Sequence, residues 1–252
     1  MKISVITVAF NNGTYIEDCI KSVLGQTYKD IEYIVVDGGS TDETLEIIKK
    51  YRDKISRWKS EPDNGIYDAM NKGIEMATGD VIGFLNSDDF YADGGVVEKV
   101  AEAFTSYGVQ SVYGDLVYVN RSNSRVIRYW KAGEYREGSV KWGWMPPHPT
   151  FFVRKEIYKR YGCFNTNLKI AADYELILRF LGKWRITTYY VSSVLIKMRM
   201  GGNSNKNIKN ILRKSIEDYK ALKINGSSRG VFALLYKNLS KIPQFFYHYY
   251  IS

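Results

Sequence analysis

The feature that most restricts the fold is an alternation between two kinds of segment over the first hundred residues. Short β-branched, apolar runs occupy residues 3–10, 31–36 and 81–85. Such runs are typical of strands buried on both faces of a parallel sheet. Between them, apolar side chains recur at helical spacing in residues 14–24, 42–51 and 66–77. This order predicts βαβ crossovers and a Rossmann-like α/β fold, with a mostly parallel sheet and helices on both faces.

The pattern changes beyond residue 91. The sequence predicts helices at residues 96–107, 153–161 and 171–181, and strands at residues 111–120, 125–131, 185–190 and 193–200. Residues 132–147, rich in Gly, Trp and Pro, read as an irregular loop. From residue 207 the sequence predicts two helices, interrupted around residues 225–230 and followed by an aromatic cluster.

The net charge of +9 is concentrated at the C-terminal end of the 252 residues. Residues 206–252 hold nine Lys or Arg against Glu217 and Asp218, an excess of +7, whereas residues 1–205 hold 27 against 25. We therefore predict a nearly neutral domain over residues 1–205 and a basic helical tail over residues 206–252. This distribution favours contact between the tail and an anionic surface, and it argues against a nucleic-acid partner.

The cysteine content indicates the compartment. Cys19 and Cys163 are the only cysteines, and they lie far apart in the sequence. This pair supports neither a disulfide framework nor a thiolate zinc site, so a reducing, cytoplasmic location is expected. The sequence shows no signal peptide and no run of apolar residues long enough to span a membrane.

Acidic side chains follow the predicted strands where ligands bind to open α/β sheets. Asp37 ends the second run, and Asp88 and Asp89 follow the third. Two adjacent carboxylates repel each other unless a cation or a proton relieves them. An all-oxygen site of this kind favours Mg²⁺ or Mn²⁺ bound to a diphosphate. From the residues alone, a metal-diphosphate site and a purely structural role for these aspartates are equally supported.

Three other positions carry candidate chemistry, each with a structural alternative. Asp173 begins an apolar helix and suits a general base or a helix-terminal carboxylate, with Glu175 in reserve. His148 lies between two prolines that fix the direction of its backbone. Its side chain suits a role near the diphosphate or the acceptor, and the alternative is a structural hydrogen-bond partner. Arg199 precedes the Gly-Gly-Asn-Ser stretch of residues 201–204. This arrangement suits the binding of a phosphate, and the alternative is a loop without a ligand after the last strand.

An ordered series of motifs resembles one family over residues 1–205. The motifs are SVITVAFNN (4–12), SVLGQT (22–27), IVVDGGSTD (34–42), EPDNGIYDAMNKG (61–73), ATGD (77–80), FLNSDD (84–89), HPTFF (148–152), ADYEL (172–176) and GGNS (201–204). Together they resemble the GT-A fold glycosyltransferases of family 2, in the bacterial polysaccharide-assembly branch similar to colanic acid transferases.

The resemblance implies roles for individual residues. It implies that the nucleotide-sugar donor, expected to be UDP-linked, is bound by Thr7, Ala9, Asn11, Asp37, Asp63, Lys72, Asn86, Ser87, Asp88, His148 and Arg199. Asn86 stands where the family has the first Asp of its DxD element, and Asp88 and Asp89 keep the carboxylates for Mg²⁺ or Mn²⁺. Asp173 matches the general base, and the reaction is expected to invert the sugar configuration.

Other classes fit less well. A dinucleotide-binding dehydrogenase needs GxGxxG and a P-loop enzyme needs GxxxxGK[ST], and the sequence contains neither. A sugar nucleotidyltransferase is the alternative enzyme. It should have a basic, glycine-rich phosphate loop after the first strand, but this sequence has Ala9-Phe-Asn-Asn-Gly13 at that place. A non-catalytic membrane-adhesion module is the third alternative, and the joint presence of Asp37, Asp88, Asp89 and Asp173 speaks against it.

The tail has an apolar stripe beside its cations. Apolar side chains recur at Ile208, Ile211, Leu212, Ile216, Tyr219 and Leu222, and again at Val231, Leu234, Leu235 and Leu239. We expect this stripe to lie on an anionic membrane surface at the inner face of the cytoplasmic membrane, which suits a glycan or lipid-linked acceptor. The alternative is that the stripe packs on the domain or on a second subunit in a homodimer.

Overall fold

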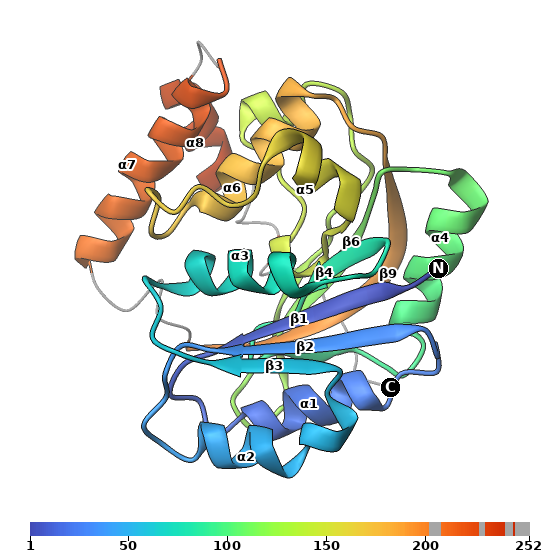
Figure 1. Ribbon diagram of the computed structural model, residues 1–252. Coiled ribbons are helices and arrows are strands. Elements are labelled where there is room, and N and C mark those ends of the chain that lie inside the picture. Colours follow the sequence, from blue (N-terminus) through green and yellow to red (C-terminus); the bar gives the residue numbers. More distant parts are fainter. Residues whose placement is uncertain (202–207, 227–229, 240–243, 245–252) are drawn as a thin grey trace.

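The structure, a computed structural model, describes residues 1–201, 208–226, 230–239 and 244 (Figure 1). The strands are β1 (Ile3–Ala9), β2 (Ile31–Asp37), β3 (Arg57–Ser60), β4 (Val81–Phe84), β5 (Phe90–Tyr91), β6 (Ser111–Val119), β7 (Val126–Trp130), β8 (Phe152–Arg154) and β9 (Thr188–Arg199). The helices are α1 (Ile16–Leu24), α2 (Thr44–Lys50), α3 (Ile66–Met76), α4 (Val96–Tyr107), α5 (Lys155–Tyr161), α6 (Ala172–Ile177), α7 (Ile208–Ile224) and α8 (Gly230–Leu239). Shorter helical segments are η1 (Arg52–Lys54), η2 (Ser139–Trp142), η3 (His148–Thr150) and η4 (Leu178–Lys183).

The strands form one twisted sheet in the order β3-β2-β1-β4-β8-β6-β9-β5, with β7 on β6. The half built from β3, β2, β1 and β4 is parallel throughout. Beyond β4 the sheet is mixed, because β8 runs antiparallel to both β4 and β6, whereas β6 and β9 are parallel. The predicted α/β fold is thus confirmed, and its parallel half carries the crossovers expected from the sequence.

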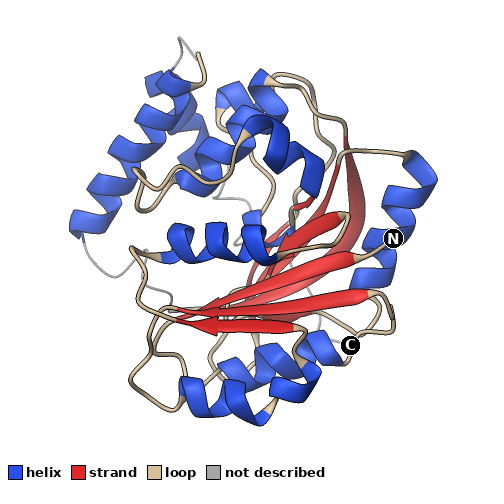
Figure 2. Cartoon of the chain, in the orientation of Figure 1, coloured by secondary structure: helices blue, strands red, loops and turns tan. Residues whose placement is uncertain are grey.

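Helices cover both faces of the sheet (Figures 1 and 2). Helices α1 and α2 lie on one face, and α3 lies on the other together with α5 and α6. Each face has its own core, since alternate side chains of a strand point to opposite sides. On β1, Ile6 belongs to the core under α3, and Val5 belongs to the core over α1.

Several elements differ from the prediction. Strand β3 has the polar sequence Arg-Trp-Lys-Ser and lies at the sheet edge, so it lacks the apolar run of a central strand. The helix predicted from residue 153 begins at Lys155, after the short strand β8. The two strands predicted near the end of the domain are one strand, β9, whose pairing with β6 shifts register near Asp115.

The tail forms the two predicted helices, and one face of them packs into the domain. Helix α7 contacts α6, and α8 contacts η2 and α7. Ala221, Leu222 and Ala233 are fully buried in the core under α3 and α6. The domain boundary at residue 205 therefore stays a prediction drawn from composition, because the described helices beyond it share this core.

The other face of the tail is exposed and apolar. Its large exposed side chains are Leu212, Ile216, Tyr219, Ile224, Phe232, Leu235, Tyr236 and Leu239. The predicted terminal aromatic cluster lies outside the described residues. Among the helices that the structure describes, none is long and apolar enough to cross a membrane.

Candidate active site

The ends of β1 and β4 meet at one edge of the sheet, as the sequence predicts. Ala9 pairs in register with Asp37, and Ile6 pairs with Phe84, so β1, β2 and β4 finish close together. The loops beyond them are joined where the side-chain amide of Asn12 donates to the Ser87 hydroxyl at 2.8 Å. Ligands bind at this edge in open α/β sheets.

The predicted residues on β1 have different exposures. Thr7 is fully buried and its hydroxyl accepts a hydrogen bond of 3.1 Å from Tyr33, and Ala9 is also buried. Asn11 is exposed and has a left-handed backbone with φ of 47°, which Asn tolerates better than most residues. Phe10, which the prediction placed inside the strand, follows β1 and is 63% exposed.

Asp37 organises the loop after β2. Its carboxylate accepts hydrogen bonds from the backbone amides of Gly39 and Ser40 at 3.2 and 3.0 Å and from the Ser60 hydroxyl at 2.6 Å. Asp37 is fully buried. The structure thus gives Asp37 a loop-holding role, and the contact with a nucleotide base stays a prediction.

Asp63 and Lys72 lie beside this loop. The Asp63 carboxylate lies against Gly38 at the end of β2, in space that a Cβ at residue 38 would take. Lys72 is held by Glu61 at 3.0 Å and Asp68 at 3.6 Å, and the contact with Glu61 raises the pKa of the lysine. The stretch that begins at Glu61 is therefore fixed on top of α3, next to the edge.

The two adjacent aspartates after β4 lie in different surroundings. Asp89 is fully buried, and its carboxylate accepts hydrogen bonds from the Arg199 amide at 3.2 Å and the Asn86 side-chain amide at 3.1 Å. Burial and the neighbouring Asp88 raise the pKa of Asp89 well above its usual range. Asp88 is only partly buried, and burial also raises its pKa while the charge of Arg199 opposes the shift.

These residues fit a divalent cation. The side-chain oxygen of Asn86 is buried and accepts no hydrogen bond from the described residues, and it lies two positions before Asp88. Such oxygens suit Mg²⁺ or Mn²⁺, which proteins often hold with one or two carboxylates while substrate phosphates and water complete the shell. Within the described ranges, no group of three His, Cys, Asp or Glu forms a complete metal site.

Arg199, at the end of β9, holds the loop that follows β4. Its guanidinium donates to the Asp88 carbonyl at 3.0 Å, to Asp18 on α1 at 2.6 Å and to the Arg121 carbonyl at 3.2 Å. It also stacks over Tyr15 and Phe90. With these partners Arg199 fixes the position of the loop that carries Asp88. Its contact with a phosphate stays a prediction.

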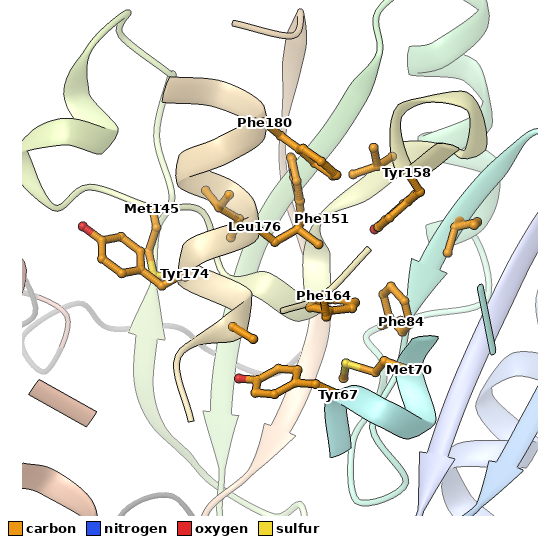
Figure 3. Close-up of a cluster of buried hydrophobic side chains, with 14 of the residues drawn as sticks. Tyr67, Met70, Phe84, Met145, Phe151, Tyr158, Phe164, Tyr174, Leu176 and Phe180 are labelled. Carbon is orange, nitrogen blue, oxygen red and sulfur yellow. The ribbon is translucent and has the colours of Figure 1, made fainter. Parts of the chain in front are cut away.

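Asp173 lies in the first turn of α6. It is partly buried, and its carboxylate accepts hydrogen bonds from the Tyr67 hydroxyl at 3.2 Å and the Tyr174 amide at 2.8 Å. Tyr67 comes from α3 and stacks on Phe164, in the cluster that Figure 3 shows between α3 and α6. Sequence reasoning did not find Tyr67, which reads as an ordinary apolar position of a helix.

His148 is buried beside the last residue of β4. Its ring stacks on Phe84, the last residue of β4, at 6.0 Å and meets Phe164 edge-on at 5.6 Å. Burial lowers the pKa of His148, and the negative charge of Asp173 opposes that shift. His148 is thus packed among aromatic rings at the end of β4, and its predicted contact with a diphosphate or an acceptor stays a prediction.

Glu175, the reserve base, is occupied elsewhere. It is buried, pairs with Arg179 at 3.0 Å and accepts a hydrogen bond from Asn225. This leaves Asp173 as the partly exposed carboxylate at the start of α6.

A parallel half-sheet with oxygen-rich loops at its carboxyl edge, followed by a mixed half-sheet and a helix that begins with a partly buried carboxylate, is typical of a GT-A type enzyme. The comparisons agree with this class. The family model described as glycosyl transferase family 2 matches residues 4–162. The chain belongs to glycosyltransferase family 2 and is a glycosyltransferase.

Two relatives illustrate the similarity. An uncharacterised glycosyltransferase of Mycobacterium tuberculosis is 35% identical over 186 residues, which cover 70% of this chain and 68% of the relative. A PGL/p-HBAD biosynthesis glycosyltransferase of Mycobacterium bovis is 29% identical over 207 residues, which cover 80% of this chain and 78% of that protein.

Solved structures share the fold. A fragment of S. aureus TarS in complex with UDP-GlcNAc superposes with a TM-score of 0.66 at 20% identity, over 86% of this chain and 66% of that one. The mannosyltransferase PcManGT from Pyrobaculum calidifontis, in complex with GDP-Man and Mn²⁺, superposes with a TM-score of 0.67 at 16% identity, over 94% of this chain and 68% of that one. The chain thus spans about two thirds of each structure.

Proposed function

We propose that this glycosyltransferase moves a sugar, with inversion, from a UDP-linked donor to a glycan or lipid-linked acceptor in surface polysaccharide assembly. The observation that carries the proposal is the position of His148. This residue stacks on Phe84, two positions before Asn86, and meets Phe164 edge-on. Phe164 in turn stacks on Tyr67, whose hydroxyl contacts Asp173. A series of packed side chains therefore connects the strand before the loop suited to a diphosphate with the carboxylate suited to a base.

Within this proposal each residue has one task. The acceptor hydroxyl gives its proton to Asp173, its oxygen bonds to the anomeric carbon, and the nucleoside diphosphate leaves with the electron pair of the broken bond. Tyr67 orients Asp173 through its hydrogen bond. Asn86 and Asp88 would hold Mg²⁺ or Mn²⁺, which supplies positive charge to the leaving diphosphate. The exposed ring of Phe10 offers a stacking surface for the base.

The acceptor is proposed to bind in a cavity of about 640 Å³ beside α8. Trp142, Trp144 and Tyr236 give it aromatic walls, and Glu134 and Arg136 add hydrogen-bonding groups. Aromatic faces beside charged groups suit a sugar, which has both apolar faces and hydroxyls. Trp142→Ala is expected to raise the acceptor KM and leave the hydrolysis of the donor unchanged.

The test of the function is a screen of nucleotide sugars by thermal shift, followed by a transfer assay with and without Mn²⁺. A donor at about 100 times its Kd adds roughly 2.7 kcal/mol of stability. We expect one UDP-sugar to stabilise the chain and to lose its sugar only when the metal is present. Full activity in EDTA would contradict the metal site. Release of pyrophosphate from a nucleoside triphosphate and a sugar phosphate would favour the nucleotidyltransferase alternative.

We also propose that the exposed face of α7 and α8 meets an anionic membrane. Leu212, Ile216, Phe232, Leu235 and Leu239 are each more than half exposed. Exposed cations of α7, Lys220 and Lys223, accompany them. Apolar side chains beside cations are typical of helices that lie in a lipid interface.

A further inference from the structure

Helix α7 packs against α6, the helix that presents Asp173, and α8 packs against α7 (Figure 1). The segment that leads to Asp173 runs from residue 169 into α6, which begins at Ala172. The family match ends at residue 162, so both the segment and the two helices lie beyond it.

Glu217 of α7 binds the backbone directly before α6. Its Oε2 accepts the amides of Ile170 at 2.7 Å and Ala171 at 3.1 Å, and its Oε1 accepts the Arg213 guanidinium at 3.0 Å. Glu217 is buried, and these backbone hydrogen bonds lower the pKa of its carboxyl despite burial. Hydrogen bonds to a charged group in a buried place are strong and directional.

The same peptide unit is held from its other side by Tyr67. The Tyr67 hydroxyl contacts the Ile170 carbonyl at 2.8 Å and the Asp173 carboxylate at 3.2 Å. The backbone of Ile170 is therefore fixed by two hydrogen bonds, one from its amide to Glu217 and one from Tyr67 to its carbonyl. A shift of this residue would move the hydroxyl that orients Asp173.

Helix α8 adds a second contact just beyond Asp173. Lys237 pairs with Asp218 of α7 at 2.8 Å, both residues are buried, and the lysine lies over the ring of Tyr174. Burial lowers the pKa of Lys237, and the charges of Asp218 and Asp173 oppose that shift. The pair thus fixes α7, α8 and the first turn of α6 to one another.

From these contacts we propose that the C-terminal helices are part of the catalytic apparatus, with Glu217 as a positioning residue that sets the direction of Asp173 through Ile170. The inference rests on the proposed role of Asp173 as the base. It predicts that the donor half of the site works without Glu217, because β1, β2 and β4 carry that half, whereas Glu217 binds the backbone before α6.

The experiment uses the full chain with Glu217→Gln, and Glu102→Gln on the exposed face of α4 as the matched control. Transfer is measured well below the melting temperature, and donor Kd is measured by calorimetry with Mn²⁺. We expect Glu217→Gln to lower kcat at least tenfold, about 1.4 kcal/mol in the barrier, with donor Kd within twofold of the parent chain. Glu102→Gln should leave both quantities unchanged.

A double-mutant cycle separates positioning from a general loss of stability. Tyr67→Phe and Glu217→Gln act on the same peptide unit, so their effects on kcat should not multiply, and the double variant should lose at least threefold less than the product. If Glu217→Gln fails to fold, Arg213→Gln replaces it in the cycle, because Arg213 holds Glu217 and is exposed at 56% of its side chain.

The outcomes are distinct. A lower melting temperature with kcat within twofold of the parent, or effects that simply multiply, would overturn the inference and leave Glu217 as a structural residue. If Asp173→Asn itself retains full transfer, the proposed function fails at the base. If Asp173→Asn is inactive and Glu217→Gln is not, only the inference about the tail fails.

Discussion

Arg199 donates a hydrogen bond of 3.0 Å to the backbone carbonyl of Asp88. The two residues are more than a hundred positions apart in the sequence, and this bond ties the end of β9 to the loop after β4. A further bond of 2.6 Å from Arg199 to Asp18 extends the tie to α1. The position of the loop that carries Asp88 therefore depends on a buried cation at the end of β9.

The first prediction follows from this tie. Arg199→Met should weaken Mn²⁺-dependent donor binding about tenfold and lower the free energy of unfolding by about 2–3 kcal/mol, because hydrogen bonds to a charged group are lost. Calorimetry and urea unfolding measure the two quantities. Arg125→Gln, on an exposed turn, is the control. Unchanged donor affinity in Arg199→Met would show that the loop holds its shape without the guanidinium.

The second prediction concerns the metal. Asp88→Asn should reduce turnover about 100-fold or more, since the metal supplies several kcal/mol to the transition state. The melting temperature of the ligand-free protein should stay level or rise, because burial penalises the charged form of Asp88. Asp89→Asn is the matched comparison, as Asp89 is already bound to Arg199 and Asn86. An equal loss of Mn²⁺ affinity in both variants would make both carboxylates ligands.

The third prediction concerns the base. Asp173→Asn keeps the shape of the side chain and cannot accept a proton, so transfer should fall by about 10²–10⁴-fold while donor binding persists. Single-turnover transfer and donor titration are the measurements. Loss of donor binding in this variant would instead place Asp173 in the nucleotide site.

The fourth prediction concerns stability and pH. Glu32 is buried and accepts hydrogen bonds from Ser4 at 2.6 Å and from the Thr78 amide at 2.6 Å, and these bonds lower the pKa of its carboxyl. A lowered folded-state pKa contributes stability above the unfolded value of about 4.3, and this stability is lost as the pH falls through the folded value.

Glu32→Gln should therefore cost about 2 kcal/mol at pH 7, and the difference from the parent chain should shrink as the pH falls below about 4. Urea unfolding at a series of pH values gives the curve, with the exposed Glu46→Gln on α2 as the control. A difference that is constant with pH would mean that the charge of Glu32 is not the stabilising feature.

The fifth prediction concerns the tail. The chain should sediment with vesicles that contain anionic lipid, and added salt should release it, because each Lys or Arg near such a surface contributes about 1 kcal/mol. Replacing Phe232 and Leu239 together by Glu should abolish sedimentation and leave donor binding intact. Ile127→Glu on β7 is the control, since Ile127 is also exposed. A full-length chain that ignores anionic vesicles at low salt, with Phe232 and Leu239 buried in a dimer, would support the second-subunit alternative.

Local pattern was enough to predict most of the elements. Helix α4 has the bounds predicted for it, and β1, β2 and β4 end within one residue of their apolar runs. Strand β3 escaped prediction because it is polar and lies at the sheet edge. Strand β9 was divided in two because its register shift breaks the alternation of side chains.

The sequence by itself determined the α/β fold, the three loops at the sheet edge and the family, since apolar periodicity and turn residues act over a few positions. Only the tertiary structure decided what surrounds each carboxylate. Asp88 and Asp89 are neighbours in the chain, yet the Asp89 carboxylate is fully buried and accepts the Arg199 amide, whereas the Asp88 side chain is partly exposed. Glu217 reads as one acidic residue of a basic tail, but folding brings it to the amide of Ile170. Burial and hydrogen bonding between distant segments set these roles, and no local pattern encodes which distant groups will meet.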